Sequence, residues 1–144
     1  MRDHMIPHRR KGEMDLKNQD IYNAALKILA QRDEEGANED YEERAPYLIA
    51  AFCCESARAD EAYRKANGLP KPTAQSAVYL ELSADFPCCA RFAATASVYL
   101  ASMLVIDEAP ELSDKLFDKY SDMMSAICME IPAEVEHISD RYGY

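Results

Sequence analysis

The sequence contains five cysteines, the side chains best suited to bind a metal. Four form two adjacent pairs, Cys53-Cys54 and Cys88-Cys89, and Cys128 stands alone. Adjacent residues on a helix point about 100° apart, so neither pair can readily give two thiolates to one tetrahedral zinc, as a C-x-x-C motif does. One cysteine of each pair could meet Cys128 in the core, but free cysteines more often act as small buried apolar residues. We therefore expect reduced thiols and no metal.

A second pattern matches half of a di-iron site. Glu134 and His137 have the E-x-x-H spacing with which helical carboxylate bundles hold iron. The sequence has no second E-x-x-H, and the apolar stretch 87–106 contains no glutamate. We interpret the pair as a surface carboxylate and histidine, and we expect no cofactor.

Clustered acids are the third chemical candidate. Glu39, Glu42 and Glu43 could begin the magnesium site of a helical nucleotide pyrophosphohydrolase, with Asp60 and Glu61 as distant partners. Such enzymes need an E-x-x-E followed by an E-x-x-D, and the second motif is absent. Acidic runs more often form a solvated face, so this magnesium-dependent enzyme is the weakest alternative. We expect the protein not to be an enzyme.

Composition excludes further classes. The 144 residues are typical of one domain, with 49% apolar residues and a net charge of −10. The four glycines are too far apart to form a P-loop or a G-x-G-x-x-G motif. The acidic excess argues against a basic face for non-specific nucleic-acid binding. We expect a soluble helical domain.

Proline, glycine and hydrophobic periodicity predict an all-α fold, a bundle of four main helices in one domain covering residues 14–132. Asn18 or Asp20 is expected to cap the first helix. Residues 69–86 should form an irregular connection with one short extended piece. The expected helices cover about residues 18–33, 45–66, 87–106 and 110–130, followed by a short helix or tail at 133–144.

Apolar spacing predicts which sides of these helices are buried. The second helix should bury Leu48, Ile49, Phe52, Cys53, Ser56 and Tyr63, and should leave Arg58, Asp60, Glu61, Arg64 and Lys65 mainly outside. The last helix should start after the cap Asp107, with Pro110 in its first turn. Its apolar face is expected to comprise Leu112, Leu116, Phe117, Tyr120, Met124, Ile127 and Ile131.

The stretch 87–106 is apolar on most sides, and Arg91 is its only charge. Its length would allow a membrane crossing, but serine and threonine interrupt it and basic flanks are missing. We expect the other helices, or a second subunit, to surround it.

Residues 1–13 differ from the rest in being basic and in holding two of the three histidines. They lack the apolar core of a secretory signal. The run from Arg9 to Met14 is what a bacterial ribosome-binding site and start codon would encode, so we expect the native chain to begin at Met14. A basic arm that docks on an acidic partner is the functional alternative.

Several segments together carry a family resemblance: Ala45-Pro46-Tyr47-Leu48-Ile49, Leu82 to Pro87 with Arg91-Phe92, Tyr99 to Leu104, Asp107-Glu108, Leu112 to Phe117, and Lys119-Tyr120. From about Asp40 to Ile131 the chain resembles the small helical head-tail connector or adaptor proteins in the neck of tailed phages and prophages of Gram-positive bacteria. None of these segments is a catalytic signature. The cysteine pairs and the acidic run 33–43 are not features of that family.

The resemblance implies a virion protein, made in the bacterial cytoplasm, that forms a ring between portal and tail without a cofactor. Its partners would be further copies of itself, in a dodecamer, together with the portal and the tail-side neck proteins. DNA would pass without specific binding, because an acidic lumen repels its backbone. The expected interface residues are Phe86, Arg91, Arg141, Tyr142 and Tyr144.

A rival interpretation keeps the fold and changes the role. The chain would be a small cytoplasmic interaction or regulatory protein of a mobile element, binding a basic partner through its acidic face. No ring and no neighbouring virion gene would then be required.

Overall fold

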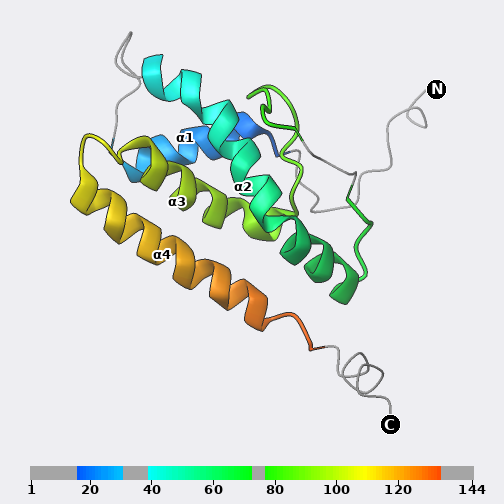
Figure 1. Cartoon of the computed structure of the whole chain (residues 1–144). Coiled ribbons are helices and arrows are strands. Elements are labelled where there is room, and N and C mark those ends of the chain that lie inside the picture. The colour runs from blue at the N-terminus through cyan, green and yellow to red at the C-terminus, as the bar shows by residue number, and fades with distance from the viewer. Residues whose placement is uncertain (1–15, 31–38, 73–76, 134–144) are drawn as a thin grey trace, which may run out of the picture.

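The computed structural model describes residues 16–30, 39–72 and 77–133, and this part of the chain is all-α, as the sequence predicts. It contains four α-helices and one 3-10 turn: α1 (Asn18–Ile28), α2 (Glu39–Ala66), η2 (Ala90–Phe92), α3 (Ala93–Leu104) and α4 (Pro110–Met129). The predictions for the leader 1–13, for the E-x-x-H pair and for a final helix or tail lie outside these residues. Figure 1 shows α3 between α4 on one side and α1 and α2 on the other.

Helix α3 is the centre of the fold. It has no charged residue, and the run from Thr95 to Ser102 is buried throughout. Helices α1, α2 and α4 all pack against it. A helix that is apolar on every side is stable in water only when neighbours cover every side, and these three helices provide that cover. Among the described helices, none has both the length and the apolar character needed to cross a membrane.

A cluster of aromatic rings joins the helices at the core. Phe52 of α2 is fully buried, and its ring centroid lies 5.7 Å from that of Tyr99 on α3 and 6.2 Å from that of Tyr120 on α4. Phe86, in the segment before η2, stacks on Phe52 at 6.4 Å. One side chain therefore connects three helices and the irregular segment.

Helix α2 begins at Glu39, six residues before the predicted start at Ala45, and Pro46 lies inside it. The expected start at about residue 45 is therefore wrong. Glu39, Asp40 and Glu42 occupy the first turn, where negative charge favours the exposed N–H groups. Because proline has no N–H, the helix lacks one backbone hydrogen bond at Pro46. The Pro46 carbonyl oxygen accepts a hydrogen bond from the Leu80 N–H at 3.2 Å.

Contacts to the end of α3 hold this early part of α2. The Arg44 guanidinium donates to the Leu104 carbonyl at 2.9 Å, which satisfies an acceptor at the C-terminus of α3. The Tyr41 hydroxyl donates to the Glu108 carboxylate. These contacts join positions 60 and 67 residues apart, so local sequence patterns cannot reveal them.

The irregular segment 77–86 caps the start of α1. The backbone N–H groups of Asn18 and Gln19 donate to the carbonyls of Ala84 and Leu82, at 2.9 and 2.8 Å. The cap residue is Lys17, whose N–H donates to the Asp20 carboxylate at 2.9 Å. The predicted cap at Asn18 or Asp20 is therefore replaced, because a distant segment supplies the acceptors that a local side chain would provide.

The central helix is shorter than predicted. The helical region begins with η2 at Ala90 instead of Pro87, and α3 ends at Leu104 instead of Ile106. The residue before η2, Cys89, has an extended backbone and gives its N–H to the Asp60 side chain at 2.8 Å. Because the Cys89 backbone is not helical, the helical region starts only at Ala90.

Helix α4 begins with Pro110, as expected, but its N-cap is Ala109 and not Asp107. Its buried residues recur every seven positions, at Ser113, Tyr120 and Ile127. The Ser102 and Ser113 hydroxyls each donate to the other residue's carbonyl at 2.9 Å. These small side chains let α3 and α4 approach closely and add two hydrogen bonds between them.

Because Phe52 connects so many elements, the Phe52→Ala substitution should lower the free energy of unfolding by about 3–5 kcal/mol. Urea unfolding followed by circular dichroism measures this loss. Met129→Ala, at a side chain that is 85% exposed, is the matched control and should change stability by less than about 0.5 kcal/mol. Equal losses in the two variants would contradict the central place of Phe52.

Candidate interaction surfaces

The structure brings together one cysteine from each pair. Cys53 and Cys88 are both buried in the core, and their thiols interact. This hydrogen bond, reinforced by burial, raises the pKa of Cys88 far above its usual range, so the thiol stays protonated. Cys128 is exposed on α4 and does not join them. In the described ranges, no three His, Cys, Asp or Glu side chains are placed to hold one metal ion.

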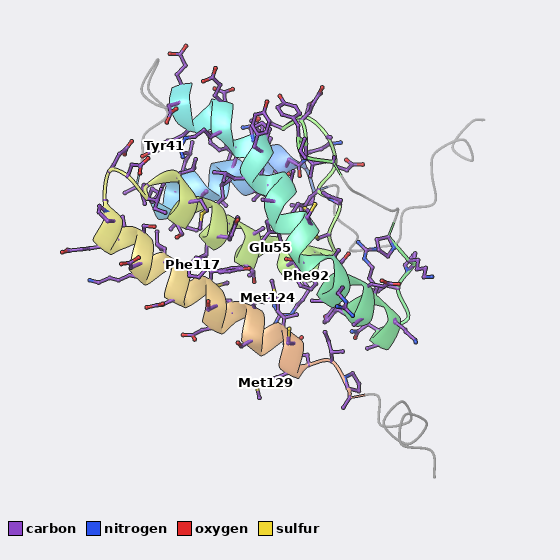
Figure 2. The ribbon with its side chains drawn as sticks, in the orientation of Figure 1. Tyr41, Glu55, Phe92, Phe117, Met124 and Met129 are labelled. Atoms are coloured by element: carbon purple, nitrogen blue, oxygen red, sulfur yellow. The ribbon has the colours of Figure 1, made fainter. Side chains whose placement is uncertain are left out.

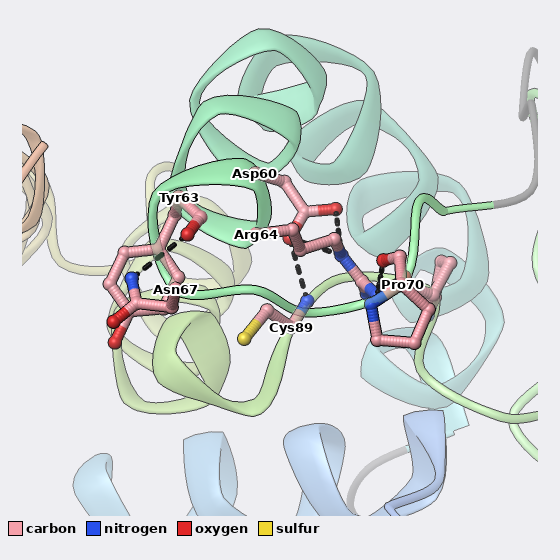
Figure 3. Close-up of polar contacts among 7 residues, drawn as sticks. Asp60, Tyr63, Arg64, Asn67, Pro70 and Cys89 are labelled. Atoms are coloured by element: carbon pink, nitrogen blue, oxygen red, sulfur yellow. Dashed lines mark hydrogen bonds and ion pairs between the residues drawn. The ribbon is translucent and has the colours of Figure 1, made fainter.

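The most connected polar group in the fold is an ion pair near the end of α2. Arg64 Nε lies 3.1 Å from both carboxylate oxygens of Asp60. Its two terminal nitrogens donate to the carbonyls of Pro70 and Pro87, each at 3.1 Å. Figure 3 shows the arginine between Asp60 and Pro70, with the Cys89 N–H on the far side of the carboxylate. Two side chains of α2 therefore hold three backbone groups, one after α2 and two before η2.

This ion pair corrects the prediction that Asp60 and Arg64 lie mainly outside. The Asp60 side chain is 4% exposed and that of Arg64 is 16% exposed. Pro70 and Pro87 stand in irregular segments, so their carbonyls lack helical or strand partners, and the guanidinium supplies the missing donors. Both carboxylate oxygens of Asp60 accept hydrogen bonds, so the pair is engaged in fixing the chain.

The same finding bears on the proposed magnesium cluster. Asp60 is engaged with Arg64, and the helix rise places it about 31 Å along α2 from Glu39. The acids of the first turns and the acid near the end of the helix therefore do not converge. Glu39, Glu42 and Glu43 remain at the surface.

The predicted interface residues within the described chain have different environments. Phe86 is 7% exposed and belongs to the aromatic core, so in the single chain it packs internally. Arg91 lies at the surface and forms two hydrogen bonds with Glu130, at 2.6 and 3.1 Å. These bonds raise the pKa of Arg91 and lower that of Glu130. Arg141, Tyr142 and Tyr144 lie outside the described residues, and an interface at these five residues stays a prediction.

A surface that the sequence did not single out lies between α3 and α4. We call it the α3–α4 groove; its volume is about 480 Å³, and its main apolar lining residues are Met103, Ile106 and Phe117. Ile106 is 47% exposed and Phe117 is 39% exposed. Ser102, Ser113, Asp114 and Asp118 also line it. The groove thus combines three large apolar side chains with polar and acidic ones.

Helix α4 carries more apolar surface than α3 covers. Leu112 and Phe117, both predicted for the buried face, are about two-fifths exposed. Figure 2 shows Phe117 and Met124 on the side of α4 that faces α3, and Met129 on its outer side. Of the side chains predicted for this face, Tyr120 and Ile127 are buried, and the buried Ser113 was not predicted. Periodicity could not reveal that α3 covers only the middle of the face.

Two buried tyrosines cannot serve as acids or bases near neutral pH. Burial, with the negative charge of Glu55 as the next cause, raises the pKa of Tyr99 to about 12. The same two causes raise the pKa of Tyr120, whose ring centroid lies 5.1 Å from that of Tyr99. Both phenols stay protonated and act as core aromatics.

Removing the Asp60 carboxylate should destabilise the fold far more than removing a similar carboxylate elsewhere on α2. Asp60→Ala leaves a mostly buried guanidinium unpaired and should cost about 3–5 kcal/mol. Asp40→Ala breaks an identical i,i+4 pair with Arg44, whose side chains are 70% and 36% exposed, and should cost about 0–1 kcal/mol. Urea unfolding compares the two variants, and similar costs would contradict the bracing role of Asp60.

Stability should fall at alkaline pH. The Tyr99 pKa is about 12 in the folded chain and 10.0 for an ordinary tyrosine, so the unfolded chain loses this proton first. The stabilisation is complete below about pH 10 and is lost as the pH rises through about 12. Urea unfolding between pH 8 and about 11 should show the decline, and Tyr99→Phe should make it shallower. An equally steep decline in that variant would rule out Tyr99 as its source.

We compared the chain with protein-family models, curated proteins and solved structures, and none of them matches. Relatives therefore supply neither a fold name nor an activity. Two surfaces of the described chain are functional candidates: the α3–α4 groove, with its apolar and acidic lining residues, and the exposed flank of α4.

Proposed function

We propose that this chain is a head-tail connector or adaptor protein of a tailed phage or prophage, which assembles as a ring between the portal and the tail. The observation that carries the proposal is the α3–α4 groove with the uncovered edges of α4. A connector buries such faces against neighbouring copies and the portal, and it works by assembly rather than by chemistry.

A ring needs two different faces on each subunit, because head-to-tail contacts must repeat around an axis until they close. The α3–α4 groove offers one face, with Ile106 and Phe117 as its apolar anchors. The complementary face would include Arg91, whose guanidinium lies at the surface beside Glu130. The proposed tail contacts of Arg141, Tyr142 and Tyr144 would add to either face.

The charge of the chain suits a channel protein. A net charge of −10 repels the phosphate backbone of passing DNA and so avoids trapping it. The acids at the start of α2 are exposed and could contribute to such a lumen. In this proposal the ring is dodecameric, is made in the bacterial cytoplasm and becomes part of the virion.

Assembly through the α3–α4 groove should fail when a charge is placed in it. Ile106→Arg buries a guanidinium in an apolar contact and should abolish the ring, leaving single subunits with unchanged helix content. Native mass spectrometry of the chain, with and without a portal protein from the same genome, measures the outcome. Ile28→Arg, at a side chain of α1 that is 41% exposed and outside the groove, is the matched control and should assemble normally.

A chain lacking residues 140–144 separates the tail from the groove: weaker assembly with intact helices would assign a contact to the tail. A wild-type chain that stays monomeric with the portal present would contradict the connector role and favour the regulatory alternative. Equal loss of assembly in Ile28→Arg would mean that the effect of Ile106→Arg is not specific to the groove.

A further inference from the structure

A second groove lies at the start of α2, between its first two turns and the segment 79–83. We call it the acidic groove; its volume is about 510 Å³. Four carboxylates line it, and Pro46 and Tyr79 are the apolar members that matter here. No lysine or arginine is among its described lining residues. The four carboxylates belong to Glu39, Glu42, Glu43 and Glu81.

The walls of the acidic groove are held in place before any partner arrives. The Gln19 N–H donates to the Leu82 carbonyl at 2.8 Å, and the Leu80 N–H donates to the Pro46 carbonyl at 3.2 Å. The Asn18 side-chain amide donates to the Glu81 carbonyl at 2.9 Å. Backbone contacts on both sides of Glu81 therefore set its position opposite α2, and a partner would not have to order this segment.

The described lining of the acidic groove carries negative charge and no positive charge. Four like charges around one groove repel one another, and a cation placed among them would relieve that repulsion. The groove thus favours a ligand that carries positive charge.

An exposed pair of aromatic rings continues the acidic groove. Tyr79 is 45% exposed, and its ring centroid lies 4.9 Å from that of Tyr47, which is 56% exposed. Val78 beside them is 77% exposed. Aromatic faces attract guanidinium and ammonium groups, and apolar surface accommodates the aliphatic stems of arginine and lysine. Carboxylates and aromatic rings on one surface are together suited to those two side chains.

From these observations we propose that the acidic groove docks a polypeptide segment of a partner protein, rich in arginine and lysine. The proposal does not depend on the connector role. The carboxylates would pair with the basic side chains, and Tyr79, Tyr47 and Val78 would contact the rest of the segment. The aromatic extension beyond the carboxylates favours a chain of residues over a compact cation, and nucleic acid would be repelled.

Fluorescence anisotropy with a labelled peptide of alternating arginine and alanine tests the proposal on the full chain. The peptide should bind, affinity should fall as salt rises, and a peptide with glutamine at each arginine should not bind. The triple variant Glu42→Gln, Glu43→Gln and Glu81→Gln should weaken binding about tenfold. The control triple Glu61→Gln, Glu111→Gln and Asp122→Asn removes the same charge elsewhere and should weaken it less than about twofold.

The aromatic contribution is tested separately. Tyr79→Ala should weaken binding about threefold, whereas Tyr79→Phe keeps the ring and should bind as the original chain does. Should the groove triple lose helix content by circular dichroism, the single variant Glu81→Lys, in the non-helical wall, provides the same comparison. Its expected result is also a clear loss of affinity.

Three outcomes would overturn the proposal. Equal losses in the two triple variants would mean that net charge alone attracts the peptide. Displacement of the peptide by spermidine at equal concentration would mean that the acidic groove takes small cations. Binding only by a chain that starts at Met14, and not by the full chain, would mean that residues 1–13 are its occupant.

Discussion

The burial of α3 is the constraint on which the rest of the structure depends. A helix with no charged residue must be covered on every side, and three other helices are needed to do it. Each of these three helices then packs one side against α3 and exposes another side to water. Helix α4 packs mainly on α3, so the edges of its apolar face stay uncovered. The exposed groove beside Ile106 and Phe117 is therefore a consequence of how the central helix is enclosed.

The connections between helices impose a second demand, because irregular backbone must still find hydrogen-bond partners. Residues 67–89 contain three prolines that donate nothing, and two of their carbonyls are satisfied by one guanidinium. Asp60 holds that guanidinium and also accepts the Cys89 N–H, just before the 3-10 turn that leads into α3. The ion pair thus ties the entry of the central helix to α2. A partly buried arginine is suited to this, since its five donors point in fixed directions.

Local sequence patterns predicted the helices and the central position of α3, because periodicity and proline placement are local properties. They failed where distant segments decide. Asp60–Arg64 and Asp40–Arg44 are the same i,i+4 pair in sequence, yet one is buried and the other is exposed. Pro46 is indistinguishable from a helix start until the contacts of Arg44 and Tyr41 with the end of α3 are known. Likewise, the spacing of apolar residues on α4 could be seen in the sequence, but the part of them that α3 buries could not.

The two grooves differ in the physics of the contact that each can make. Burial of Ile106 and Phe117 would be driven by the hydrophobic effect, which is insensitive to moderate salt and favours long-lived contacts. Pairing across Glu42, Glu43 and Glu81 would be screened by salt and would mainly accelerate encounter and select for charge. The two surfaces are lined by different residues, so neither contact blocks the other directly. A chain built in this way can keep one neighbour permanently while it exchanges another.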